Sequence, residues 1–266
     1  MAKNQRITAM WTNLLHQCHS VCQVSVNESA NDHADDLAGL DSQMAADALA
    51  ARYEPIIAPL GNRPRVIAQL GQSLDGRIAT ATGESHFVTG SADRTHLHRL
   101  RALSDAVLIG AGTLVADDPQ LTVRAVSGPN PTRIIVANCA SLPAKLRVFT
   151  DGAAPTWCIG PLDLSHAGVD RWFDFQPANP ATMISALAKA GIKRLLVEGG
   201  ARTVSAWLAA GLVDYLYLTI APIIIGSGPR GLELPAIDQL DAALRPAVRR
   251  FTLGEDTLYR LNFNAE

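Results

Sequence analysis

From Arg65 onward, short and uninterrupted apolar runs alternate with segments of helical pattern, and this alternation narrows the possible folds more than any other feature of the sequence. Expected strands fall at 66–70, 106–109, 133–137, 156–159, 195–197 and 215–220, and expected helices at 91–103, 181–190 and 201–210. Apolar strands without polar alternation are typical of a parallel sheet that is covered on both faces. We predict an α/β fold with a mixed, mostly parallel sheet, antiparallel C-terminal strands within 251–263 and helices on both faces.

The first 60 residues differ from the rest of the chain. They contain 3 basic and 7 acidic residues, and 25–41 is polar and acidic, as in a loop or disordered link. The run 45–53 predicts a short helix with Asp41 or Ser42 as its N-cap, and prolines at 55, 59 and 64 follow it. We expect residues 1–60 to form an N-terminal extension, partly helical or disordered, and residues 61–266 to form the main domain.

Charge and cysteine content exclude several classes of partner. Lys and Arg number 23 against 25 Asp and Glu, which favours neither nucleic acid nor an anionic membrane surface. No apolar run approaches the roughly 20 residues of a membrane span, and no signal peptide is recognisable. Cys18 and Cys22 lack the second ligand pair of a metal site, while Cys139 and Cys158 read as buried hydrophobes. We expect reduced cysteines, a cytoplasmic protein and no metal.

Glycine follows three of the expected strands, where ligands bind in open α/β sheets. Residues 226–231 match G-x-G-x-x-G, but no helix can begin before Pro235, so this segment predicts a loop. Gly199 and Gly200 stand between a strand and a helix, an arrangement that presents free N–H groups and a positive helix dipole to a phosphate. The Gly110–Gly112 turn offers the same arrangement. We expect a nucleotide to lie across these two turns, with Glu198 at the mouth of the cleft.

Two charged groups remain open to interpretation from the residues alone. Asp117 and Asp118 could bind Mg²⁺ or cap a turn before Pro119. The arginines of the same region could hold a phosphate or remain solvated at the surface: Arg94, Arg99, Arg101 and Arg124.

An ordered series of motifs between residues 64 and 263 resembles the reductase domain of the bifunctional riboflavin-biosynthesis deaminase/reductase family. The series consists of Gly71-Gln72-Ser73-Leu74-Asp75-Gly76, Gly83-Glu84-Ser85, Leu100-Arg101-Ala102, the 110–113 turn, Asp117-Asp118-Pro119, Val197-Glu198-Gly199-Gly200 and Gly211-Leu212-Val213-Asp214. The resemblance implies a dihydrofolate-reductase-like fold, NADPH as cofactor and a homodimer. It also implies reduction of a ribosylamino-pyrimidine phosphate to its ribitylamino form by hydride transfer to C1′ of the ribose.

The resemblance also implies roles for individual residues. Substrate contacts are expected at Ser85, Arg101, Leu121, Arg124 and Glu198, and Glu198 is the expected catalytic residue. Together with the glycine turns, cofactor contacts are expected at Gly71, Phe87, Thr89, Gly110, Gly112, Thr113, Asp117, Asn138, Gly199, Gly200, Ala201, Arg202 and Thr203.

Three departures from the family pattern leave alternatives open. The zinc ligands of the deaminase half are missing, so this chain is not expected to deaminate. Gln69 stands where many members have a lysine, and Phe87 where a tryptophan is usual. The alternatives are a reductase of the same fold that acts on another pterin-like or nucleotide-derived substrate, and a non-catalytic nucleotide-binding module.

Overall fold

The central element of the fold is a nine-stranded mixed sheet. We describe a computed structural model, which covers residues 2–19, 42–137, 142–161, 168–174 and 179–264. The strands of this part of the chain are β1 (Arg65–Ser73), β2 (Ala106–Gly110), β3 (Thr132–Val136), β4 (Thr156–Ile159), β5 (Arg171–Phe173), β6 (Arg194–Val197), β7 (Tyr215–Ala221), β8 (Ala247–Leu253) and β9 (Asp256–Asn262). Their spatial order is β5-β4-β3-β2-β6-β1-β7-β9-β8, and only the pairs that involve β9 are antiparallel. The predicted sheet is therefore confirmed.

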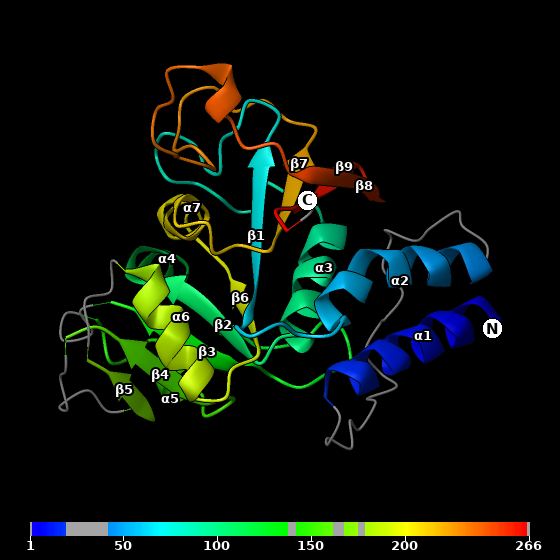
Figure 1. The fold of residues 1–266 in the computed structure, drawn as a ribbon, viewed down its shortest axis with the longest axis horizontal. Helices are drawn as coiled ribbons and strands as arrows, with labels where there is room; N and C mark the ends of the chain where they lie inside the picture. Colours follow the sequence, from blue (N-terminus) through cyan, green and yellow to red (C-terminus); the bar gives the residue numbers. More distant parts are fainter. Residues whose placement is uncertain (1, 20–41, 138–141, 162–167, 175–178, 265–266) are drawn as a thin grey trace.

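Helices cover both faces of this sheet, as expected (Figure 1). They are α1 (Ala2–Cys18), α2 (Ser42–Ile57), α3 (Ser91–Ala102), α4 (Ala111–Asp117), α5 (Arg147–Thr150), α6 (Pro180–Lys189) and α7 (Ala201–Ala209), with a 3-10 turn η3 (Leu240–Ala242). One hydrophobic core joins α1, α2 and α3 to Ile67, Val107 and Leu196 of the sheet. A second core joins α6 and α7 to the alternate residues Val66, Leu108 and Leu195, because successive strand residues point to opposite faces.

The strand order brings the two predicted glycine turns together. β2 pairs with β6 in parallel, and Leu108, two residues before the end of β2, lies opposite Val197, the last residue of β6. β6 in turn pairs with β1 in parallel. The carboxyl ends of β1, β2 and β6 therefore lie at one edge of the sheet, which confirms the expected adjacency of the turns.

The N-terminal helices α1 and α2 lie side by side and pack into the same core as α3 (Figure 1). Trp11, Leu15 and Tyr53 are among their fully buried side chains. Arg194 caps the C-termini of both helices, because its guanidinium donates to the carbonyl oxygens of Cys18 and Ile56. A cation that donates to the last carbonyls of a helix also offsets the helix dipole.

Helix α2 is longer than predicted and continues through Pro55. Proline lacks the N–H that would donate to the carbonyl oxygen of Ala51, four residues earlier. The Arg260 guanidinium donates to that carbonyl instead. A tertiary contact that the local sequence does not reveal therefore satisfies the group that would otherwise end the helix.

Individual segments and one cysteine can also be compared with their predicted structure. The segment 226–231 contains no helix, as predicted. Helix α3 begins at Ser91, as expected, and has Gly90 as its N-cap. Cys158 was expected to be a reduced thiol, and this was wrong, since it is disulfide-bonded. Within the described residues, no helix is long and apolar enough to cross a membrane.

Candidate active site

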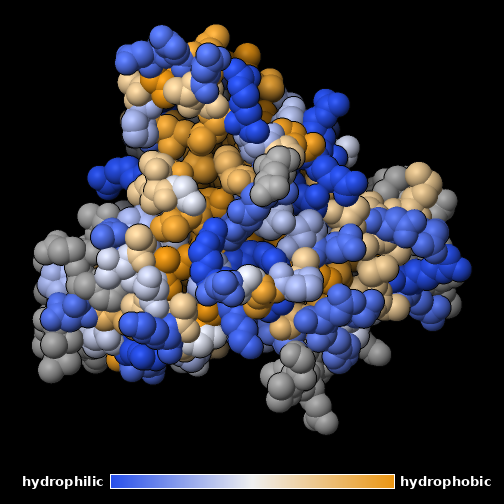
Figure 2. All heavy atoms as spheres, viewed as in Figure 1, coloured by the Kyte–Doolittle hydropathy of each residue, from blue (hydrophilic) through white to orange (hydrophobic). Residues whose placement is uncertain are grey.

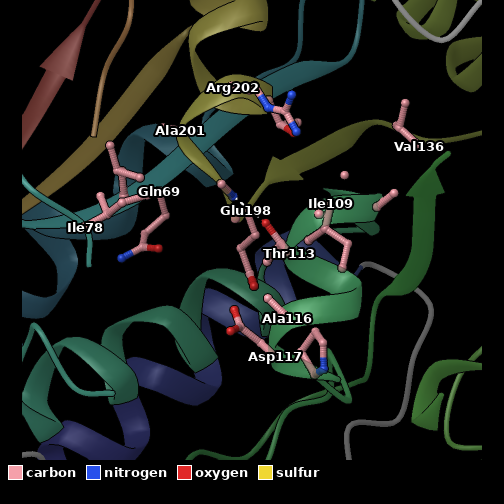
Figure 3. Close-up of a pocket in the computed structure, with 18 of the residues that line it drawn as sticks. Gln69, Ile78, Ile109, Thr113, Ala116, Asp117, Val136, Glu198, Ala201 and Arg202 are labelled. Atoms are coloured by element: carbon pink, nitrogen blue, oxygen red, sulfur yellow. Dashed lines mark hydrogen bonds between the residues drawn. The ribbon is translucent and has the colours of Figure 1, made fainter. Parts of the chain in front are cut away.

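A cleft of about 1110 Å³ opens at the edge of the sheet where β1, β2 and β6 end (Figure 3). This volume is slightly above the range of roughly 300–1,000 Å³ for small-molecule sites and gives room for more than one ligand. Most of the residues expected from the sequence line it: Gly71, Ser85, Arg101, Gly110, Gly112, Thr113, Asp117, Leu121, Glu198, Gly199, Gly200, Ala201, Arg202 and Thr203. Phe87, Thr89 and Arg124 do not line it, and Asn138 lies outside the described residues.

The two glycine turns contact each other directly in the floor of this cleft. The Gly200 amide donates to the Thr113 hydroxyl at 2.7 Å. A Cβ atom at Gly110 would lie 2.7 Å from the Thr203 hydroxyl, and Gly199 has φ +98°, a conformation that L side chains rarely adopt. Larger residues at these positions would force the turns apart.

The first turn of α7 leaves amide groups unused. The Thr203 amide donates to the carbonyl oxygen of Gly200 at 3.0 Å. No described residue accepts a hydrogen bond from the Ala201 or Arg202 amides, and both residues line the cleft. Free N–H groups at the positive end of a helix dipole fit the diphosphate of a dinucleotide.

Arg101 and Glu198 form a buried ion pair in the cleft wall. Nε and Nη2 of Arg101 donate to the two carboxylate oxygens of Glu198 at 2.7 and 2.8 Å, and Nη1 donates to the Thr122 carbonyl oxygen at 3.0 Å. Both side chains are less than a tenth exposed. A guanidinium has five N–H groups, so two remain for a ligand, and each carboxylate oxygen keeps a second lone pair. The sequence predicted both residues but not their pairing.

Arg124 lies outside the lining, and the charge of Arg101 acts on it. Burial, together with the charges of Arg101 and Arg147, lowers the pKa of Arg124. Its backbone amide donates to Nδ1 of His98 at 3.0 Å. Burial and the charges of Arg101 and Arg124 lower the pKa of His98 to about 3, so this histidine is neutral near pH 7 and accepts that hydrogen bond. The positive charge of this region is therefore carried by arginines.

Behind β1, a buried carboxyl group that the sequence did not single out orders the cleft wall. Asp93 accepts hydrogen bonds from the Thr219 hydroxyl at 2.6 Å and the Thr89 hydroxyl at 2.7 Å. The Gln69 amide, which lines the cleft, approaches the same carboxyl group at 3.5 Å. Burial raises the pKa of Asp93. Thr89 also packs closely against Gly71. A Cβ atom added at Gly71 would lie only 2.7 Å from the Thr89 methyl group.

The remaining expected residues lie as follows. The Phe87 ring is 68% exposed and packs under the Arg94 guanidinium at 4.2 Å. Asp118 accepts from the Arg147 backbone amide at 2.8 Å and from its Nε at 3.2 Å, which fits the turn interpretation of this aspartate. Sequence reasoning missed a further wall of the cleft, formed by Pro229, Arg230 and Glu233. Only the 226–231 glycines pointed to that segment, and they were interpreted as a plain loop.

The fold and the cleft define an α/β protein with a ligand-binding site at the carboxyl ends of its parallel strands. The family model of the RibD C-terminal domain matches residues 64–258, and the chain belongs to this family. It is 35% identical over 215 residues to the 2,5-diamino-6-ribosylamino-4(3H)-pyrimidinone 5′-phosphate reductase of Methanothermobacter thermautotrophicus, with 74% of this chain and 96% of that protein covered. It is 35% identical over 173 residues to the riboflavin biosynthesis protein RibD of Bacillus amyloliquefaciens, covering 61% of this chain and 47% of that protein.

Solved structures agree with this assignment. Acinetobacter baumannii RibD, in its form 1, superposes with a TM-score of 0.68 at 29% identity, over 83% of this chain and 63% of that chain. The Saccharomyces cerevisiae riboflavin biosynthesis reductase Rib7 has a TM-score of 0.62 at 21% identity, over 80% of this chain and 98% of that one, and supports the fold alone. The chain thus spans about half of the curated RibD relative and nearly all of the archaeal reductase. It is an oxidoreductase of the riboflavin-biosynthesis group.

Proposed function

We propose that this protein uses NADPH to reduce a ribosylamino-pyrimidine 5′-phosphate to the ribitylamino form, in the cytoplasm. The observation that carries the proposal is the buried Arg101–Glu198 pair, which lies in the same cleft as the open amides at the start of α7. The two spare N–H groups of Arg101 and the open α7 amides thus offer hydrogen-bond donors to a substrate phosphate and to a cofactor diphosphate. The name of the archaeal relative supplies the substrate class.

The residues of this chain would bind and orient the two reactants. The two spare N–H groups of Arg101, together with Arg124, bind the substrate phosphate through charge-assisted bonds. Glu198 accepts a hydrogen bond from the substrate and stabilises the cationic imine of the opened ribose. NADPH, when bound, supplies the hydride that reaches C1′. The amides of Ala201 and Arg202 bind the cofactor diphosphate, so that donor and acceptor carbons are held in contact.

The direct test is NADPH oxidation, followed at 340 nm, with the ribosylamino-pyrimidine phosphate as substrate. We expect turnover that depends on both reactants and a ribitylamino product confirmed by mass spectrometry. The same assay with pterin-like or other nucleotide-derived substrates addresses the alternative suggested by Gln69, which lines the cleft in place of the family lysine. If the protein binds NADPH but oxidises it with none of these substrates, it is the non-catalytic nucleotide-binding module instead.

Arg124→Ala tests the phosphate site. We expect KM for the phosphorylated substrate to rise about 10- to 100-fold, because a hydrogen bond between charged groups contributes about 1.5–3 kcal/mol. The dissociation constant for NADPH should stay within about twofold of wild type, since Arg124 lies outside the lining that contains the glycine turns and its charge acts on Arg101. Steady-state kinetics and a cofactor titration measure the two quantities. A collapse of NADPH affinity would show that the role is assigned wrongly.

We also propose that the protein is a homodimer. Large apolar side chains are exposed along the segment between β7 and β8, where Figure 2 shows orange surface at the top of the view: Ile223, Ile224, Leu234, Ile237, Leu240 and Leu244. Such a gathering is typical of a protein interface. Sedimentation should give a dimer for the wild type and a monomer for Leu240→Asp. A wild type that is monomeric at all concentrations would contradict the proposal.

A further inference from the structure

A buried carboxyl group lies directly behind the cleft wall. Asp93 belongs to the first turn of α3 and is only 4% exposed. A Cβ atom added at Gly71, which lines the cleft, would lie 3.5 Å from the Oδ2 atom of Asp93. Burying a carboxyl group costs free energy unless hydrogen bonds compensate for the lost water. The partners of Asp93 therefore indicate what this group does.

These partners come from three separate segments of the chain. The Oδ1 atom of Asp93 accepts from the Thr219 hydroxyl of β7 at 2.6 Å. Its Oδ2 atom accepts from the Thr89 hydroxyl at 2.7 Å and from Nε2 of Gln69 in β1 at 3.5 Å. Thr89 and Thr219 do not line the cleft, whereas Gln69 does. Gln69 is therefore the partner through which Asp93 can act on a bound ligand.

The contact with Asp93 determines which atom of the Gln69 amide faces the cleft. A carboxamide has a donor nitrogen and an acceptor oxygen, and a carboxylate can only accept. Turning the amide over would place two acceptor oxygens side by side. Among the described residues, the Gln69 side chain makes no other hydrogen bond, so its Oε1 atom is left for a ligand. In Figure 3 the nitrogen of Gln69 is turned away from Glu198, and the oxygen lies on the Glu198 side.

We infer that Asp93 is a positioning residue for the reaction: it holds the Gln69 amide so that Oε1 accepts a hydrogen bond from an N–H group of the pyrimidine. The ring and its substituents carry such groups, and a donor that leaves water for the cleft needs an acceptor there. The inference rests on the proposed function, because it takes the ligand beside Glu198 to be the ribosylamino-pyrimidine. It adds to that function a buried residue that acts through another residue.

Steady-state kinetics of Asp93→Ala, which removes the acceptor for Nε2 of Gln69, test the inference. KM for the pyrimidine substrate should rise about 5- to 10-fold, the range of one hydrogen bond between neutral groups. The turnover number kcat should stay within about twofold, because the lost bond is made equally in the ground state and the transition state. Gln69→Leu should have the same effect. Since Asp93 acts through Gln69, the double variant should raise KM no further than either single variant.

Matched variants separate positioning from stability. Asp93→Asn keeps an oxygen for Gln69 and Thr89 and can place its NH2 group beside the Thr219 hydroxyl, so KM should stay within about twofold of wild type. Thr219→Val removes a bond to the same carboxyl group from a different strand than that of Gln69. It should lower the Tm of thermal unfolding and leave KM unchanged. If Asp93→Ala does not fold, Asp93→Ser supplies the test, because its hydroxyl is one bond shorter than the carboxyl group.

The other outcomes of these measurements each have a defined meaning. A double variant whose rise in KM is the product of the two single rises would show independent roles and overturn the inference. A wild-type KM in Asp93→Ala or in Gln69→Leu would also overturn it and leave the proposed function intact.

Calorimetric titration with the ribitylamino-pyrimidine phosphate repeats the comparison without hydride transfer. If the wild type binds this ligand but does not turn over the ribosylamino substrate, the proposed function fails. The same pattern among the dissociation constants of the variants would then still support the inference, and a different pattern would overturn it. A wild type that binds neither pyrimidine would reject both.

Discussion

Glu198→Ala is expected to lower kcat at least about 100-fold and the free energy of unfolding by about 3–5 kcal/mol. The activity loss follows from removing the carboxylate proposed to stabilise the cationic imine. The stability loss follows from leaving the Arg101 guanidinium, only 7% exposed, without its charge partner. Kinetics with saturating NADPH and urea denaturation measure the two effects separately.

Two matched variants separate the roles of this carboxylate. Glu198→Gln keeps one acceptor oxygen for Arg101, so we expect a smaller loss of stability but a large loss of kcat. In Arg101→Ala with Glu198→Ala, no unpaired charge is left, so part of the stability should return while kcat stays low. Full activity of Glu198→Gln would remove this residue from the catalytic site. Additive stability losses in the double variant would contradict the ion pair.

Local signals were sufficient to predict the cleft but not its ion pair. Strand apolarity and glycine position specified that β2 and β6 end in turns, and parallel pairing brought those turns together. The pairing of Arg101 with Glu198 spans 97 residues. It depends on how α3 packs against the sheet, and no sequence spacing encodes that rotation. For the same reason, Asp93 could not be predicted as the shared acceptor of Thr89 and Thr219, which come from different elements.

For the N-terminal helices, local sequence signals pointed away from the contacts that the structure shows. A Pro55 inside α2 and an acidic segment before it argued for an extension outside the main domain. The compensating groups are arginines far along the chain: Arg260 donates to the carbonyl that Pro55 leaves open, and Arg194 closes both helices. Tyr53 also forms a 2.6 Å hydrogen bond with His96 of α3, the helix that carries Arg101. These contacts join α1 and α2 to α3, the helix that carries Arg101.

The N-terminal helices should therefore behave as part of the reductase core, and Trp11→Ala tests this. Trp11 is 1% exposed, packs edge-on against Tyr53 and donates to the Ser127 carbonyl oxygen at 2.8 Å. The substitution leaves a cavity and an unpaired carbonyl, so we expect a loss of about 3–5 kcal/mol. At about 2–4 °C per kcal/mol for a chain of this size, Tm should fall by about 6–20 °C.

The shape of the unfolding transition distinguishes the two interpretations. If α1 and α2 share the core, Trp11→Ala should lower one cooperative transition, and a bound cofactor should shift that same transition upward. A separate extension would instead unfold first and leave the cofactor-stabilised transition at its wild-type Tm. Met44→Ala, on the exposed face of α2, should change stability by less than about 0.5 kcal/mol and controls for substitution within these helices.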